Sequence, residues 1–213
     1  MVQRHASSSF GAAYAFPGGV LDAADGDIED FCSGRNAADA QQILKVRAGG
    51  LDFYVGAIRE LFEETGVLLA TNDSSAEALA TMRDRLNHNQ ISWTEFVRET
   101  GVRLLCNELH YFSHWITPEQ MKKRYTTRFF VAECPVGQAA HHDERELTNS
   151  KWITAAEALQ AGKTGSMKLH YPTQKTLERL AAHNRVGEIV DWARECEKSG
   201  VESILPVMPG ATQ

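Results

Sequence analysis

The chain has 213 residues, 43% of them hydrophobic and 23% charged, which suffices for one well-packed globular domain. Its formal net charge of −6 argues against a partner bound through general contacts with nucleic-acid phosphates. No apolar run approaches the ~20 residues that span a bilayer and no signal peptide is evident, so we expect a cytoplasmic protein without membrane contact.

The four cysteines do not form a recognisable metal or redox motif. They are Cys32, Cys106, Cys134 and Cys196, and no pair has C-x-x-C spacing. Reduced thiols that fill the core are expected instead, as in most cytosolic proteins. The chain ends in Gly-Ala-Thr-Gln, so no Ser-Lys-Leu peroxisomal signal is expected at its C-terminus.

The first elements are two short strands and a glycine turn. Met1–Arg4 has the composition of a strand end, and Ala12–Phe16 predicts a second short strand. This strand runs into Pro17-Gly18-Gly19, where glycine allows a sharp turn and leaves backbone amides and carbonyls free to approach a ligand. The segment Val20–Gly50 follows, acidic at its start and helical in composition at Ala37–Arg47.

A helix over Leu51–Glu64 carries the strongest functional signal. Glu60, Glu63 and Glu64 are spaced i, i+3 and i+4, which puts three mutually repelling carboxylates on one side of the helix. One interpretation is a solvated acidic face; the other is a site for a divalent cation with oxygen ligands, Mg²⁺ or Mn²⁺. We favour the cation because Gly66 ends the helix and an apolar run after it predicts a buried strand beside the carboxylates.

Two further helices are predicted at Ser74–Asn87 and Ser92–Thr100. Each begins with a Ser-x-x-Glu capping box, and Gly101 closes the second. We call the segment from about residue 74 to residue 101 the annex. Two roles are open for it: a lid or wall that selects the substrate, or simple packing against the rest of the domain.

The rest of the chain predicts further strands and helices. The basic cluster Lys122-Lys123-Arg124 lies between two of the strands and is either a solvated loop or a phosphate contact. His141 and His142 are adjacent and lack a spaced Cys or His partner, so a zinc site is not expected. Strands are predicted at Leu109–Ile116, Arg128–Glu133, Lys151–Thr154 and Ser203–Met208, and helices at Ala155–Gln160, Thr173–His183 and Val186–Lys198.

The sequence around the acidic helix resembles the Nudix box, G-x5-E-x7-R-E-U-x-E-E-x-G-U, in which U is a bulky aliphatic residue. The first half matches at Gly19, but Arg59 follows it by 40 positions instead of 14, so about 26 residues are inserted inside the box. Two positions compete for its first Glu: Asp25 has the right spacing from Gly19, and Leu51 has the right spacing from Arg59. The second half matches without a gap at Arg59, Glu60, Leu61, Glu63, Glu64, Gly66 and Val67.

Nearly the whole chain is similar to one branch of the Nudix family, which contains coenzyme A diphosphatases and carries an insertion in the box. The short pattern of bacterial coenzyme A pyrophosphatases, which places a second Arg between Arg4 and the glycine turn, is not matched. The shared segments are Phe16–Asp25, Trp115–Pro118, Arg128–Phe130, Asp143–Trp152 and Pro172-Thr173.

The resemblance implies an α/β protein with the Nudix fold, an α/β/α sandwich around a central mixed β-sheet, plus the helical annex. It implies one Nudix hydrolase domain over residues 1–213, with the insertion at about residues 26–50. It also implies Mg²⁺- or Mn²⁺-dependent hydrolysis of the diphosphate in a nucleoside diphosphate linked to another group. Nudix proteins often dimerise, so a homodimer is a further expectation.

By the same resemblance, Glu60, Glu63 and Glu64 are metal ligands, and the Gly19 carbonyl is a further ligand. Arg59 lies four residues before Glu63 on the helix and is expected to orient its carboxylate.

An acid from a later loop completes the metal shell or acts as general base in the family. Glu146, six residues before Trp152, is our choice, and Glu144 is the alternative. The expected substrate is coenzyme A or an acyl-coenzyme A. ADP-ribose, a dinucleotide or a nucleotide sugar is the alternative within the class, and a non-catalytic ligand-sensing domain is the alternative outside it.

Overall fold

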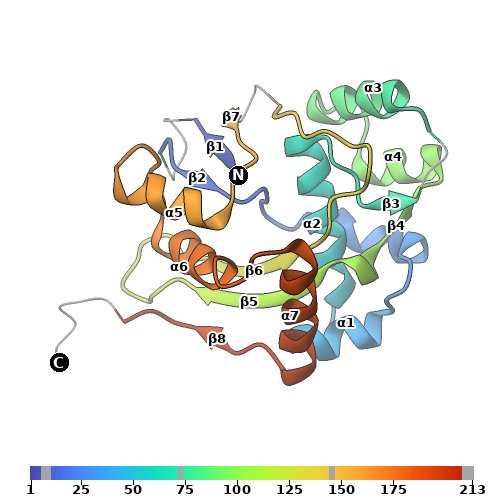
Figure 1. Cartoon of the computed structure of the whole chain (residues 1–213). Helices are drawn as coiled ribbons and strands as arrows, with labels where there is room; N and C mark the ends of the chain where they lie inside the picture. The colour runs from blue at the N-terminus through green and yellow to red at the C-terminus, as the bar shows by residue number, and fades with distance from the viewer. Residues whose placement is uncertain (6–10, 72–73, 144–146, 208–213) are drawn as a thin grey trace.

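The computed structural model describes residues 1–5, 11–71, 74–143 and 147–207. In Figure 1, α2 lies beside α1, α3 and α4 on one side of the molecule, and α5 and α6 lie on the other, with strands between them. The helices are η1 (Ala23–Phe31), α1 (Ala37–Leu44), α2 (Gly50–Thr65), α3 (Ala76–Asn87), α4 (Trp93–Thr100), η2 (Cys106–Glu108), α5 (Ala155–Lys163), α6 (Tyr171–Leu180) and α7 (Val186–Ser199). The strands are β1 (Val2–Arg4), β2 (Tyr14–Ala15), β3 (Ala70–Thr71), β4 (Arg103–Leu104), β5 (His110–Ile116), β6 (Thr126–Val131), β7 (Leu147–Ser150) and β8 (Ser203–Ile204).

The described strands form three short sheets. β5 pairs antiparallel with β6 and parallel with β8, so this sheet is the mixed one. β1 lies between β2 and β7 in an antiparallel sheet, where Val2 is opposite both Ala15 and Ser150. β3 and β4 form a two-stranded sheet. In the part of the chain that the structure describes, no helix combines the length and apolar character needed to cross a membrane.

Helix α2 provides the centre of the hydrophobic core. Its side chains Ile58 and Phe62 are almost fully buried. The helix passes close to α1 at Gly50, where a Cβ would lie 2.5 Å from the Gln41 amide nitrogen, so only glycine fits there. Gly66 ends the helix in the left-handed conformation (φ 77°), and its amide donates to the Phe62 carbonyl at 2.8 Å.

The insertion packs into this core and is not a surface loop. Helix η1 leads into it, and Asp22 is the N-cap residue of this helix and forms a capping box with Asp25. Ile28 of η1 and Ala40 and Leu44 of α1 are buried in the same cluster as the α2 side chains. The inserted residues therefore enlarge the core beside α2.

The annex also packs on α2. Phe62 of α2 stacks on Phe96 of α4, with ring centroids 5.1 Å apart, and Phe96 stacks on Trp93 at 5.0 Å. The predicted capping box at Ser92 is present, but α3 begins later than predicted and is capped by Ser75. Since aromatic stacking adds to the burial of apolar area, α4 is fixed to the core.

Two strand predictions differ from the structure. Lys151–Thr154 is not a strand, because Thr154 accepts the Glu157 amide and caps α5. The run after Gly66 is buried, but it is not paired as a strand before Ala70. At Leu68 a side chain replaces the missing partner strand: the Leu68 amide donates to Gln138 Oε1 at 2.7 Å, and Gln138 Nε2 donates to the Leu68 carbonyl at 2.9 Å.

A buried polar network fastens α7 to β5 and to the insertion. Glu197 of α7 accepts the Tyr111 amide at 2.8 Å and Arg35 Nη2 at 3.4 Å, and His110 Nδ1 lies 3.7 Å from its Oε2. Burial alone would raise the pKa of Glu197. The nearby His110 ring, the hydrogen bond from the Tyr111 amide and the charge of Arg35 outweigh it, so this pKa lies below its ordinary value of 4.5.

We expect Glu197→Gln to lower the free energy of unfolding by about 1–3 kcal/mol at pH 7, because the buried Arg35 loses its charged acceptor. Since the native pKa is depressed, the stability that Glu197 provides is present above pH 4.5 and is lost as the pH falls through the native pKa. Urea unfolding at pH 7 and at pH 3 measures both effects. Glu195→Gln, exposed on the same helix, is the control, and equal losses in the two variants contradict the assignment.

Candidate active site

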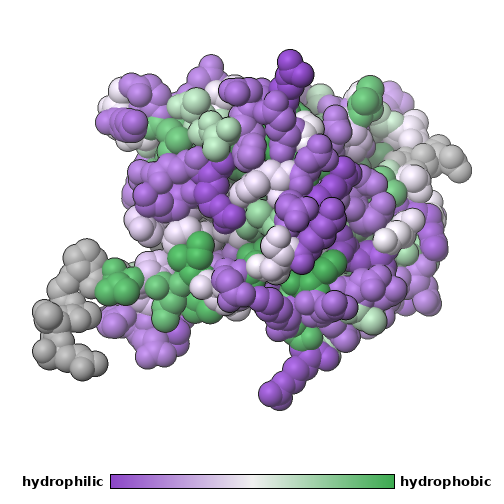
Figure 2. All heavy atoms as spheres, turned by 60° about the horizontal axis from the view of Figure 1, so that its bottom comes forward, coloured by the Kyte–Doolittle hydropathy of each residue, from purple (hydrophilic) through white to green (hydrophobic). Residues whose placement is uncertain are grey.

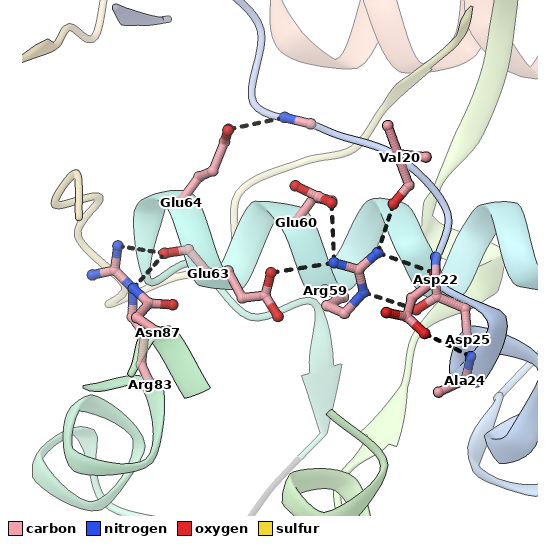
Figure 3. A network of polar contacts seen from close by, with 11 residues as sticks. Val20, Asp22, Ala24, Asp25, Arg59, Glu60, Glu63, Glu64, Arg83 and Asn87 are labelled. Carbon is pink, nitrogen blue, oxygen red and sulfur yellow. Dashed lines mark hydrogen bonds and ion pairs between the residues drawn. The ribbon is translucent and has the colours of Figure 1, made fainter. Parts of the chain in front are cut away.

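Arg59 of α2 is the centre of a network of ion pairs (Figure 3). Its Nε donates to Asp25 Oδ1 at 2.8 Å and its Nη2 to Asp25 Oδ2 at 3.1 Å, which makes a bidentate pair. Its Nη1 donates to Glu60 Oε1 at 3.0 Å and to Glu63 Oε2 at 3.2 Å. Nη2 also donates to the Val20 carbonyl at 3.0 Å. One guanidinium thus joins η1, the segment that follows the glycine turn and two acids of α2.

Asp25, one of the two candidates for the first acid of the box, is the one that pairs with Arg59. It is 1% exposed, and its Oδ2 also accepts the Asp22 amide at 2.8 Å. Leu51, the competing position, is a buried core residue. A Cβ on Gly56 would lie 2.9 Å from Asp25 Oδ2, so glycine at that position of α2 leaves room for the carboxylate to reach Arg59. The sequence signal for Asp25 was its spacing from the glycine turn.

The turn at Pro17-Gly18-Gly19 lies against the acidic face of α2. The Gly18 amide donates to Glu64 Oε2 at 2.9 Å, and its φ of 148° favours glycine. A Cβ on Gly19 would overlap the Glu60 carboxylate, so the backbone of the turn packs directly against this side chain. Figure 3 shows Glu60 and Glu64 on the side of the turn, while the Glu63 carboxylate reaches Arg59.

The network holds more negative than positive charge. Three carboxylates, those of Asp25, Glu60 and Glu63, contact the single guanidinium of Arg59. Burial raises the pKa of Glu63 to about 7, the Arg59 charge opposes this and the Glu60 charge adds to it. The site would therefore be stabilised by an additional cation.

Helix α3 holds the last turn of α2 from outside. Arg83 donates to the Glu63 carbonyl through Nε at 3.1 Å and Nη2 at 2.9 Å, and Asn87 Nδ2 donates to the same oxygen at 3.1 Å. The last carbonyls of a helix lack partners within the helix, and a cation there also interacts favourably with the helix dipole. Burial lowers the pKa of Arg83. In the sequence, Arg83 and Asn87 are polar residues of a predicted helix, and no pattern indicates their partner. This contact was therefore not predicted.

The oxygen atoms of the three glutamates and of the glycine turn suit a hard divalent cation, both as ligand atoms and by their negative charge. Carboxylate and carbonyl oxygens are the ligands that Mg²⁺ and Mn²⁺ prefer, and the network has negative charge to spare. Within residues 1–5, 11–71, 74–143 and 147–207, no group of three or more His, Cys, Asp or Glu side chains is arranged to hold a metal ion. Ligation by Glu60, Glu63, Glu64 and the Gly19 carbonyl stays a prediction.

Glu146 and Glu144, the two candidates for the acid from a later loop, lie outside the described residues.

An open cleft begins at the glycine turn and at Glu60 and extends along the β5–β6 hairpin. No described residue of the annex lines it, so the structure favours packing over a lid as the role of the annex. Figure 2 shows hydrophobic surface gathered in patches on one face of the molecule. Grouped exposed apolar side chains typically mark a binding site. In this cleft they are Val20, Leu21, Met121, Tyr125, Trp152, Tyr171, Val186 and Val207.

Comparison with known families identifies the class to which this domain belongs. Residues 29–180 match the family described as the NUDT19 Nudix domain, which is more than half of the chain. The chain therefore belongs to this family of Nudix hydrolase domains. The predicted α/β Nudix fold is confirmed by the crystal structure of a NUDIX hydrolase from Alicyclobacillus acidocaldarius. That structure is 23% identical with a TM-score of 0.67, and the match covers 89% of this chain and 86% of that one.

Curated relatives include an acyl-coenzyme A diphosphatase NUDT19 from Xenopus laevis, 27% identical over an alignment of 190 residues that covers 80% of this chain and 50% of that protein. The putative nudix hydrolase 7 of Caenorhabditis elegans is 25% identical over 185 residues, covering 87% of this chain and 53% of that protein. The human acyl-coenzyme A diphosphatase NUDT19 is 24% identical over 172 residues. The chain spans about half the length of the first two relatives.

We expect Asp25→Asn to destabilise the protein by about 3–5 kcal/mol, because it breaks a buried ion pair while preserving the shape of the side chain. Thermal and urea unfolding at neutral pH measure the loss. Asp27→Asn, exposed in the same helix η1, is the matched control and should change stability little. If the two variants are equally stable, Asp25 is not the residue that fixes Arg59.

Proposed function

We propose that this chain hydrolyses the diphosphate bond of a nucleoside diphosphate linked to another group, with Mg²⁺ or Mn²⁺ as cofactor. The observation that carries the proposal is the network around Arg59. It sets Glu60 and Glu63 beside each other and next to a glycine turn whose backbone contacts Glu60 and Glu64, at one end of an open cleft.

The reaction requires water to attack phosphorus in line with the leaving oxygen, while negative charge on the phosphoryl oxygens is neutralised. A bound divalent cation supplies this neutralisation and lowers the pKa of a coordinated water. Glu60, Glu63 and Glu64 would hold that cation. Arg59, itself fixed by Asp25, keeps the first two carboxylates in place, and the turn brings backbone close to the diphosphate.

Within this class we propose coenzyme A or an acyl-coenzyme A as the substrate. The cleft beyond the acidic site is lined largely by apolar and aromatic side chains, which suits a long and mostly uncharged group attached to the diphosphate. The names of the NUDT19 relatives from frog and human agree with this choice.

The alternatives are ADP-ribose, a dinucleotide or a nucleotide sugar as substrate, and a non-catalytic domain that senses such a ligand. The sensor is disfavoured because all three Glu residues of the box are retained next to an ordered Arg59. A cytoplasmic location and a homodimer are further proposals.

Glu63→Gln and Glu64→Gln should each abolish turnover, because an amide oxygen is a poor replacement for a carboxylate facing a dication and a diphosphate. Release of the adenosine-containing product in the presence of Mg²⁺ measures turnover. Mn²⁺ titration by calorimetry should show weaker binding, and thermal unfolding should show a folded protein. Glu77→Gln, exposed on α3, is the control and should retain full activity. Near-normal rates in the site variants would remove these residues from the mechanism.

Removal of metal provides a separate test. We expect EDTA to stop hydrolysis and added Mg²⁺ or Mn²⁺ to restore it. A panel of coenzyme A, an acyl-coenzyme A, ADP-ribose, NADH and diadenosine polyphosphates, compared by kcat/KM, then identifies the substrate. Turnover that persists after chelation contradicts the metal, and a clear preference for a panel member without coenzyme A contradicts the substrate.

A further inference from the structure

Arg128 of β6 places an unneutralised positive charge in the cleft. Its guanidinium lies over the Phe53 ring of α2, with Cζ 4.2 Å from the ring centroid, and both residues line the cleft. The side chain is partly buried, and its Nε is buried without a hydrogen-bond partner in the described structure. A buried donor that lacks an acceptor costs free energy, so this position is suited to an acceptor from a ligand.

No described acid neutralises Arg128. Among the ion pairs of residues 1–5, 11–71, 74–143 and 147–207, none involves this guanidinium, and its hydrogen-bonded neighbour is the Tyr111 phenol. Burial lowers the pKa of Arg128, which agrees with a cation that lacks a counter-charge.

The position of Arg128 separates it from the acidic site. Phe53 and Glu60 both line the cleft and are seven residues apart on α2. At 1.5 Å rise per residue this is roughly 10 Å along the helix. A diphosphate at Glu60 is much shorter than that, so the anion that fits Arg128 is a different group of the same ligand.

Other basic residues lie near the same cleft. Arg124 lines it, on the exposed loop that also carries Lys122 and Lys123. Arg124 Nε donates to the Thr117 carbonyl at 3.2 Å, which ties the loop to the end of β5. The planar fork of arginine matches the oxygens of a phosphate, and a dianion is attracted to it more strongly than a single carboxylate.

We propose that Arg128 is a specificity-determining residue that binds a phosphomonoester on the nucleoside part of the substrate, apart from the diphosphate that is cleaved. The site would thereby select 3′-phosphorylated adenosine compounds over those that carry only the diphosphate. This inference rests on the proposed function for its turnover assay, but the binding of the extra phosphate is measurable without hydrolysis.

The binding experiment compares adenosine 3′,5′-bisphosphate with AMP by calorimetry on the full chain in the presence of Mg²⁺. A charge-assisted contact predicts that the wild type binds the bisphosphate about 10-fold or more tightly than AMP. Arg128→Gln should reduce this preference to within about 2-fold by weakening only the bisphosphate, whereas Arg128→Lys should keep part of it. Thermal unfolding checks that both variants are folded.

The turnover experiment compares coenzyme A with 3′-dephospho-coenzyme A. We expect Arg128→Gln to raise KM for coenzyme A about 10-fold, with kcat within about 2-fold and KM for the dephosphorylated substrate unchanged. Arg194→Gln, exposed on α7 and outside the cleft, is the control and should behave as wild type.

The assignment is overturned by a phosphate preference that survives in folded Arg128→Gln, or by one that is lost in Arg124→Gln instead. A wild type that shows no preference for the bisphosphate also overturns it. If the wild type hydrolyses neither coenzyme A nor its dephosphorylated form, the proposed substrate fails, while the binding comparison still decides the role of Arg128.

Discussion

The bidentate pair between Asp25 and Arg59 is the constraint on which the site depends. Arg59 is largely buried, and burial alone would disfavour its charge. The carboxylates of Asp25, Glu60 and Glu63 outweigh this effect and raise its pKa. In return the guanidinium holds the two glutamates in fixed positions. The pair also fastens the start of the insertion to α2. The same interaction therefore stabilises this part of the fold and fixes the geometry of the site.

The insertion and the annex both pack against helix α2. The insertion buries Ile28 and Leu44 against α2, and the annex stacks Phe96 on Phe62 and donates from Arg83 to the Glu63 carbonyl. Each added segment therefore stabilises the helix that carries the acids and leaves the cleft open. We propose that the β5–β6 hairpin and the loop between its strands, which line the cleft, select the substrate.

The cleft carries charges of both signs at different positions. The end at Glu60 has negative charge in excess and is suited to a dication, whereas Arg128 carries an unpaired positive charge further along. A ligand that brings its own metal-bound diphosphate and a second phosphate would satisfy both ends. The exposed aromatic residues Trp152 and Tyr171 add apolar surface for its uncharged part.

The sequence alone determined the long helices, the cap at Gly66 and the set of acids on α2, because helical periodicity and capping are local properties. It also placed the family, through residues that are contiguous in the chain. Only the tertiary structure decided between Asp25 and Leu51, since the insertion removes any fixed spacing to Arg59. It likewise decided that a side chain, Gln138, pairs with Leu68 in place of a strand, and that Arg128 faces the cleft without an acid. These are contacts between segments far apart in the chain, and local pattern carries no information about them.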